Sequence, residues 1–274
     1  MNTGQTVVIK CGGSIINELT SVFFQNVQKL FKDGYKVIIV HGGGPDIQQM
    51  LTKLEIETEF VDGLRRTSKD ALEVVTMVLA GKVNKQLVTD LQQHQLQAIG
   101  LSGCDGMLLE TTAVDLDKLG YVGEVVRVNE QLLNQLTSNQ YIPVVSSIGV
   151  NKEGDCFNIN ADLAAGAIAQ AVQAEKLMFV TDVKGVLQDK QLISELTKGE
   201  IQKLIDNGTI HGGMIPKVTA AVNALSDTLD EVNIISGIHG FLDENGNMVG
   251  TAIKHDSEGG GHNDEFIISN VSTI

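Results

Sequence analysis

Short runs of consecutive apolar residues, rich in Val and Ile, alternate along this chain with longer stretches whose apolar residues recur at helical spacing. The apolar runs predict β-strands at 6–10, 36–41, 98–101, 142–146, 177–181 and 231–235. The stretches between them predict helices at 17–32, 46–54, 68–93, 129–138, 160–173, 197–206 and 216–228. Strands that are apolar on both faces need helices on both sides, joined by right-handed crossovers. The pattern therefore predicts an α/β fold with an open, mainly parallel sheet between two helical layers, and ligands at its carboxyl edge.

Two segments interrupt this alternation. The stretch 107–128 alternates apolar and polar residues around a glycine-containing turn, which predicts a hairpin that projects from the sheet. Asn245-Gly246 predicts a second, two-residue hairpin turn. An Ala-rich helix ends near Glu175, and this break predicts an N-terminal lobe at 1–175 and a C-terminal lobe at 176–274.

The end of the chain is polar and rich in glycine at 256–264, which predicts a loop before a last short strand at 265–269. His255, His262 and Asp264 leave a metal site open there as an alternative.

Charge and composition argue against several classes of partner. The formal net charge is -14, and aromatic residues make up only 4% of the chain, with no Trp. Nucleic acid and anionic membranes are therefore unexpected partners. No apolar run reaches membrane-spanning length and no N-terminal signal pattern is present, so we expect a cytoplasmic protein.

Cys11, Cys104 and Cys156 fit no disulfide or metal spacing and are predicted to be small buried apolar residues, although a reactive Cys11 stays open as an alternative.

Several predicted strands run directly into glycine-containing turns. These turns follow Lys10, His41, Thr181 and Ser236. Glycine lets backbone N–H groups approach an anion closely, so the pair at 12–13 and the triplet at 42–44 predict an anion-binding edge. No Walker or dinucleotide glycine pattern is present, and Lys10 precedes its glycines, whereas the Walker lysine follows them.

Charged residues near helix starts add to this prediction. Asn160 is placed to cap a helix that has Asp162 in its first turn, where the helix dipole favours a carboxylate. Lys217 also falls in a first turn, where the dipole disfavours a cation, and an anionic ligand would explain that placement. Arg65 and Arg66 are suited to carboxylate recognition, but a solvated basic pair is an equally good interpretation.

The order of these motifs resembles that of the amino acid kinase family, and within it the branch that phosphorylates N-acetyl-L-glutamate. The matching segments span residues 7 to about 253: VVIKCGGSI, VIIVHGGGPDI, DGLRRTS, VVSSIGV, FNINADLAA, FVTDVKGVL, GGMIPKV and GTAI. The resemblance implies a three-layer αβα sandwich of the carbamate kinase-like type. It also implies ATP-dependent phosphorylation of the side-chain carboxylate of N-acetyl-L-glutamate to N-acetyl-L-glutamyl 5-phosphate, the second step of arginine or ornithine biosynthesis.

The same resemblance implies roles for individual residues. Lys10 and Lys217 would stabilise the transferring phosphoryl group, and Asp162 would orient both lysines. The acyl-amino acid would contact Gly43, Gly44, Arg65 and Asn158. The nucleotide would contact Gly12, Gly13, Thr181, Asp182, Val183, Gly185, Gly212 and Gly213. Mg²⁺ would be carried on the ATP phosphates without a dedicated protein site. The N-terminal lobe would bind the amino acid and dimerise, and the C-terminal lobe would bind ATP.

The chemistry is consistent with the residues present. A glutamyl side chain has a reference pKa near 4.3 and is ionised at neutral pH, so the nucleophile needs no general base. We therefore expect His41 to be non-catalytic. About five residues precede the first strand, and by resemblance this suggests the arginine-insensitive, homodimeric kind, which lacks an extra N-terminal helix. A sibling kinase acting on glutamate, aspartate, an aminoadipate-type substrate or uridine monophosphate is an alternative, as is a non-catalytic amino-acid sensor.

Overall fold

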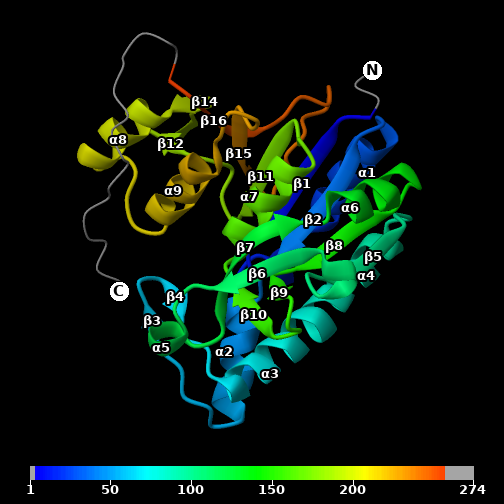
Figure 1. Ribbon diagram of the computed structural model, residues 1–274. Coiled ribbons are helices and arrows are strands. Elements are labelled where there is room, and N and C mark those ends of the chain that lie inside the picture. Colours follow the sequence, from blue (N-terminus) through cyan, green and yellow to red (C-terminus); the bar gives the residue numbers. More distant parts are fainter. Residues whose placement is uncertain (1–3, 257–274) are drawn as a thin grey trace.

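The computed structural model describes residues 4–256, and its centre is one eight-stranded sheet (Figure 1). In spatial order the strands are β14 (Glu195–Thr197), β16 (Gly250–Lys254), β15 (Glu231–Ser236), β11 (Lys176–Thr181), β1 (Thr6–Cys11), β2 (Lys36–His41), β8 (Ile142–Ser146) and β5 (Ala98–Ser102). Neighbouring strands from β15 to β5 are parallel, whereas β16 runs antiparallel to β15. All the predicted strands up to residue 235 are present, and the predicted open, mainly parallel sheet is confirmed.

Helices cover both faces of this sheet, and alternate residues of each strand supply two separate cores (Figure 1). In β1, Val7 and Ile9 face one core and Val8 faces the other. The first core is covered by α1 (Ser21–Lys32), α2 (Gly44–Lys53), α3 (Lys69–Thr76) and α4 (Asn84–Gln93). The second is covered by α6 (Glu130–Ser138), α7 (Ala161–Ala171), α8 (Lys198–Asp206) and α9 (Met214–Ala224). The predicted three-layer sandwich is therefore confirmed.

The long helix predicted at 68–93 is interrupted by a π-helical segment. α3 ends at Thr76, η2 (Met77–Val83) is π-helical, and α4 begins at Asn84. A π-helical turn holds more residues than an α-helical one, so it rotates the residues that follow about the helix axis. Asn84, the first residue after this segment, is fully buried against the sheet although it is polar.

A second, smaller sheet lies beside the central one. Strands β6 (Leu109–Ala113) and β7 (Val122–Val128) form the antiparallel hairpin predicted at 107–128. The hairpin does not project alone, because β9 (Ile148–Val150) and β10 (Cys156–Ile159) join it in a small closed sheet. β9 and β10 have three and four residues, which is too short for a recognisable alternation. β10 leads directly into α7, so this small sheet sets the position of residues 158–162.

The other described elements are short and lie in the connecting loops. They are η1 (Ile16–Glu18), β3 (Phe60–Val61), β4 (Leu64–Arg65), η3 (Asp105–Met107), α5 (Leu116–Leu119), β12 (Leu187–Gln188) and β13 (Gln191–Leu192). A turn is present at the predicted place, but it has three residues rather than two: the Asp243 N–H donates to the Asn247 carbonyl at 2.9 Å across residues 244–246, and Gly246 has a φ of +85°. The strand predicted at 265–269, and the metal site that would need His262 and Asp264, lie outside the described residues.

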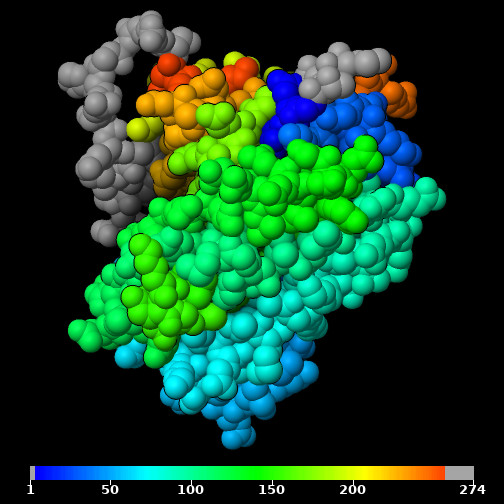
Figure 2. All heavy atoms as spheres, turned by 45° about the vertical axis from the view of Figure 1, so that its right-hand side comes forward, coloured from blue at the N-terminus to red at the C-terminus, as the bar shows by residue number. Residues whose placement is uncertain are grey.

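The predicted lobe boundary coincides with the start of β11. The backbone N–H of Glu175 donates a 2.8 Å hydrogen bond to the Thr6 carbonyl, and β11 pairs with β1 immediately afterwards. Figure 2 shows the C-terminal segments, in yellow and orange, at one end of the molecule and the segments around residues 50–80, in cyan and light blue, at the other. One sheet thus continues across the boundary, and the division into two functional lobes stays a prediction.

Candidate active site

The turns singled out in the sequence meet at the carboxyl edge of the central sheet. In the order β15, β11, β1 and β2, these four strands are direct neighbours and run parallel. Their carboxyl ends therefore lie side by side, followed by the turns after Ser236, Thr181, Cys11 and His41. This is the edge at which parallel α/β sheets bind ligands.

Two of the glycine turns touch each other. A Cβ atom added to Gly13 would lie 2.5 Å from the Gly44 backbone nitrogen and 2.8 Å from the Gly43 Cα, so only glycine allows this approach. A Cβ on Gly42 would lie 3.3 Å from the Ala161 side chain, which places the start of α7 against the same turn. The N-termini of α2 and α7 thus converge here, and their dipoles favour a negative charge between them.

Lys10 and Asp162 form an ion pair at this point. Their Nζ and Oδ1 atoms are 2.6 Å apart, the Lys10 side chain is only 14% exposed, and its ammonium lies 5.6 Å from the Phe179 ring centre. Asn160 caps α7 through its Oδ1, which accepts from the Asp162 N–H at 2.8 Å, as the sequence predicted. Gly12 leaves the lysine uncovered, since a Cβ there would lie 3.6 Å from its Nζ. The ammonium is therefore held at the end of β1, beside the glycine turns that follow β1 and β2.

Lys217 pairs with a different aspartate. It lies in the first turn of α9, and its Nζ is 2.5 Å from Oδ1 of Asp182, the residue that follows β11. The hydrogen bond from Lys217 lowers the pKa of Asp182 below its ordinary value. Gly212 and Gly213, just before α9, have open space at their Cβ positions, and Gly212 has a φ of +53°. The structure thus joins Lys217 to Asp182 and Lys10 to Asp162, whereas the sequence interpretation gave both lysines to Asp162.

The turn at 181–185 is fixed from two sides. The Thr181 hydroxyl donates to the Val183 carbonyl at 2.9 Å and accepts from the Val183 N–H at 3.3 Å. Gly185 has a φ of +146°, and a Cβ there would lie 2.5 Å from the Thr251 hydroxyl oxygen. Thr251 is buried in β16 and accepts from the Val186 N–H at 2.8 Å. The turn therefore has a defined shape beside the Lys217–Asp182 pair.

Arg65 and Arg66 have different environments. Arg66 is exposed and pairs with Glu59 at 3.0 Å, as expected for a solvated basic pair. Arg65 is 8% exposed, its guanidinium donates to Gln48 Oε1 at 2.6 Å, and it lies 4.6 Å from the Phe60 ring centre. Burial lowers the pKa of Arg65. Within residues 4–256 Arg65 forms no ion pair, so its charge is available to an anionic ligand.

Asn158 lies close to Arg65. Its Nδ2 donates to the Thr67 hydroxyl at 3.2 Å, and that hydroxyl donates to the Arg65 carbonyl at 2.8 Å. Thr67 is fully buried. Thr67, a residue the sequence interpretation did not single out, therefore links the Asn158 side chain to the backbone of Arg65.

A chain of buried hydrogen bonds runs from Asn84 through His41 to Gly42 and supports the turn at 42–44. The Asn84 amide donates to His41 Nε2 at 3.1 Å and to the Val144 carbonyl at 2.8 Å. Because Nε2 accepts, the neutral imidazole carries its proton on Nδ1. That Nδ1–H donates to the Gly42 carbonyl at 2.9 Å. Burial is the main cause that lowers the pKa of His41 to about 4. Sequence reasoning missed Asn84, although its position inside an amphipathic helix was the available signal.

The cysteines differ from the prediction. Cys11 is buried, and burial raises its pKa to about 12, which disfavours a reactive thiolate there. Cys104 and Cys156 are partly exposed rather than buried, and their sulfur atoms are only 3.3 Å apart. The prediction that all three are buried apolar residues is wrong for these two, because spacing along the chain does not reveal which strands become neighbours.

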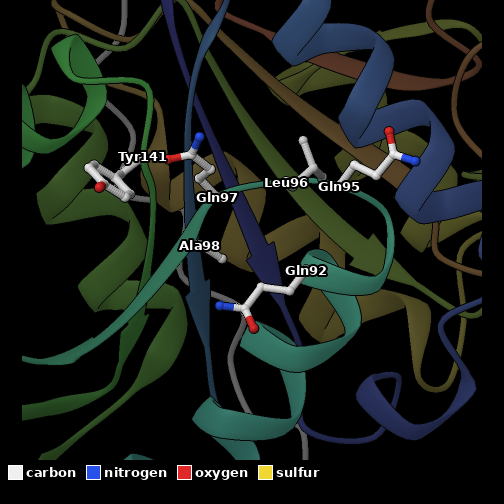
Figure 3. A pocket seen from close by; sticks show the side chains of 6 residues that line it. All are labelled: Gln92, Gln95, Leu96, Gln97, Ala98 and Tyr141. Atoms are coloured by element: carbon white, nitrogen blue, oxygen red, sulfur yellow. The ribbon is translucent and has the colours of Figure 1, made fainter.

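A shallow cavity of about 420 Å³ lies away from these residues (Figure 3). Its lining residues precede or begin β5 and β8, at the amino edge of the sheet: Gln92, Gln95, Leu96, Gln97, Ala98 and Tyr141. It contains none of the predicted site residues.

In residues 4–256 no three His, Cys, Asp or Glu side chains are grouped to hold a metal ion. Over the same residues, none of the helices has the length and apolar character needed to cross a membrane.

The chain is similar to known proteins over most of its length. The chain is 55% identical over 251 residues to an acetylglutamate kinase of Geobacillus stearothermophilus, covering 92% of this chain and 97% of that protein. It matches the structure of smu.665 from Streptococcus mutans with a TM-score of 0.79 and 33% identity, covering 92% of this chain and 99% of that one. Carbamate kinase from Giardia shares the fold, with a TM-score of 0.66 at 19% identity over 92% of this chain and 99% of that one. A family model described as the amino acid kinase family matches residues 5–252, and the chain belongs to that family.

Proposed function

We propose that this protein transfers the γ-phosphoryl group of ATP to the side-chain carboxylate of N-acetyl-L-glutamate in arginine biosynthesis. Relatives 52% and 55% identical over 92% of the chain carry the name acetylglutamate kinase. The observation that carries the proposal is the pair of lysines, Lys10 and Lys217, each held by its own aspartate at the edge where the glycine turns meet.

The charges at this edge suit the reaction. An ionised carboxylate must approach a polyanionic phosphate, and catalysis of phosphoryl transfer rests on positioning and charge neutralisation. Lys10 and Lys217 supply two cations, and Gly43 and Gly44 supply backbone N–H groups at the start of α2. Asp162 keeps Lys10 in place, and Lys217 must exchange Asp182 for phosphate oxygens when ATP binds. No side chain has to remove a proton from the nucleophile.

The acceptor and the nucleotide would occupy opposite sides of the lysines. Arg65 would pair with a carboxylate of the acyl-amino acid, since it is buried without an ion-pair partner within residues 4–256, and Asn158 would bind beside it. The nucleotide would lie over the turn at 181–185, over Gly212 and Gly213, and against the turn at 12–13. On this proposal lobe 1–175 would bind the acceptor and lobe 176–274 would bind ATP, apart from the contact with the turn at 12–13.

Mg²⁺ would be bound by the ATP phosphates, where it would neutralise part of their charge. Asp162 would stay paired with Lys10 and would leave the ion to the phosphate oxygens. We further propose a homodimer in the cytoplasm, as the family resemblance implies, with no nucleic acid or membrane partner, in keeping with the net charge of -14.

Hydroxylamine trapping tests the proposal directly. With ATP, Mg²⁺ and N-acetyl-L-glutamate, the acyl phosphate should be trapped as a hydroxamate. Faster turnover of glutamate, aspartate or aminoadipate would assign the chain to a sibling kinase. No turnover of any of these acceptors, with retained binding of N-acetyl-L-glutamate, would identify a sensor.

A further inference from the structure

We propose that Cys104 and Cys156 form a thiol–disulfide modification site that constrains the strand leading to the acceptor residues. The two cysteines are separated by 52 positions in the sequence, yet their sulfur atoms are 3.3 Å apart. Both side chains are partly exposed, so a small disulfide molecule in solution can reach them, whereas Cys11 is buried.

Strand β9 holds the two cysteines in place. Cys104 follows β5, where the Gly103 N–H donates to the Ile148 carbonyl at 2.7 Å and the Cys104 thiol lies 3.8 Å from the Gly149 carbonyl. Cys156 begins β10 and is paired with Val150 across the β9–β10 ladder. Backbone contacts to the same short strand therefore set the positions of both sulfur atoms.

The fit at Gly103 limits how far this loop can move. A Cβ at Gly103 would lie 2.1 Å from the Ile148 carbonyl oxygen, so the backbone of the loop is packed directly on β9. A disulfide bond is about 2 Å long, and the sulfur atoms must therefore approach by a little over 1 Å. Rotation of the two side chains and a small shift of the first residue of β10 can supply this approach.

The oxidant we propose is a small-molecule disulfide such as oxidised glutathione. In the first step one cysteine thiolate attacks a glutathione sulfur, forming a mixed disulfide and releasing one glutathione thiolate. In the second step the other cysteine attacks the protein sulfur of that mixed disulfide, and the second glutathione leaves. The released thiolates take up the two protons lost by the cysteines, so two protein thiols are oxidised as one disulfide is reduced to two thiols.

Either cysteine can make the first attack, because both side chains are partly exposed, and the other then resolves the mixed disulfide from a sulfur–sulfur distance of 3.3 Å. Proximity of the resolving sulfur makes the second step intramolecular and favours the internal disulfide over accumulation of the glutathione adduct.

The position of Cys156 couples this site to the acceptor side, a consequence that rests on the proposed function. Asn158 follows two residues later in β10, and Asn160 and Asp162 open the next helix. A shift of the first residue of β10 would therefore reach the contact between Asn158 and Thr67. The turn at 181–185 and α9 lie on other elements, so ATP binding should change little.

Intact mass spectrometry of the full chain tests the modification itself. After treatment with oxidised glutathione and quenching with an alkylating agent, the wild type should lose the mass of two hydrogen atoms and carry alkyl groups only at Cys11 in the denatured protein. Cys104→Ser and Cys156→Ser should each instead gain the mass of one glutathione at the remaining cysteine of the pair, because no second sulfur is there to release it. Cys11→Ala is the matched control and should form the disulfide like the wild type.

Either of two mass results would overturn the proposal: stable glutathione adducts on the wild type, or no reaction at Cys104 and Cys156. Because this readout needs no kinase activity, it also decides the matter if the proposed function fails. With an active enzyme, the oxidised wild type should show a KM for N-acetyl-L-glutamate changed by about tenfold, reversed by dithiothreitol. An unchanged KM in the fully oxidised protein would refute the coupling to the acceptor strand.

Discussion

Replacing Gly13 with alanine tests whether the two glycine turns must touch. The added Cβ would lie 2.5 Å from the Gly44 nitrogen, 2.8 Å from the Gly43 Cα and 2.9 Å from the Gly43 carbonyl carbon. All three are backbone atoms, so no side chain can rotate away to relieve the clash. To reach an ordinary contact of 3.4 Å, the turns after β1 and β2 must separate by about 0.9 Å.

The size of the effect follows from this separation. Overpacking of a close contact costs about 1–3 kcal/mol, which corresponds to roughly 2–12 °C in Tm for a chain of this length. Under the proposed function, the same movement would displace the N–H groups at the start of α2 from the reacting phosphoryl group. A displacement of about 1 Å at such a site can lower kcat/KM by about a hundredfold.

Gly12→Ala is the matched control for stability. A Cβ at Gly12 meets only the flexible end of Lys10, at 3.6 Å, so its Tm should stay close to that of the wild type. Urea and thermal unfolding would measure the stability of both variants, and hydroxamate formation would measure kcat/KM. If Gly13→Ala were as stable and as active as the wild type, the close contact of the two turns would not determine the shape of this edge.

Three further predictions concern single side chains. Lys217→Ala should lower kcat by about a hundredfold or more, because a transition-state charge contact is lost. The control Lys203→Ala, on the exposed face of α8, should keep the kcat of the wild type. If Lys217→Ala also kept the wild-type kcat, Lys217 would not belong to the site. Arg65→Ala should raise the KM for N-acetyl-L-glutamate, while Arg66→Ala should leave it unchanged. If Arg65→Ala changed only the KM for ATP, Arg65 would contact the nucleotide and not the acceptor. His41 has a pKa of about 4 in the folded chain and an ordinary value of 6.5, so its contribution to stability is complete above pH 6.5 and is lost as the pH falls towards 4. The wild type should lose about 2 kcal/mol of its free energy of unfolding between pH 7 and pH 5. Urea unfolding of His41→Asn should show a correspondingly weaker dependence of this free energy on pH. The same pH dependence in both proteins would show that His41 is not buried in its neutral form.

The sequence pattern predicted the layers and the central strands because their signals are local. A run such as that of β1 is apolar on both faces, and this alone requires cover on both sides of the sheet. The glycine turns were predictable for the same reason, since each follows its strand directly. The π-helical segment η2 was not predictable, because it changes the hydrogen-bond pattern inside a helix whose apolar spacing looks continuous.

The residues that sequence reasoning missed act across long separations. Asn84 contacts His41 and the Val144 carbonyl, and Thr67 contacts Asn158, which is 91 positions away. Such contacts depend on which strand ends are neighbours, and a single sequence does not state that order.

The sequence by itself determined the fold class, the family resemblance and the identity of the charged residues at the carboxyl edge. Periodicity, caps and turn chemistry act within about a dozen residues, so they can be read without coordinates. Only the tertiary structure decided that Lys10 pairs with Asp162 while Lys217 pairs with Asp182, and that Arg65 is buried while Arg66 is exposed. Only it placed Cys104 beside Cys156. Each of these outcomes depends on the packing of elements far apart in the chain, which fixes distances between side chains that no local pattern contains.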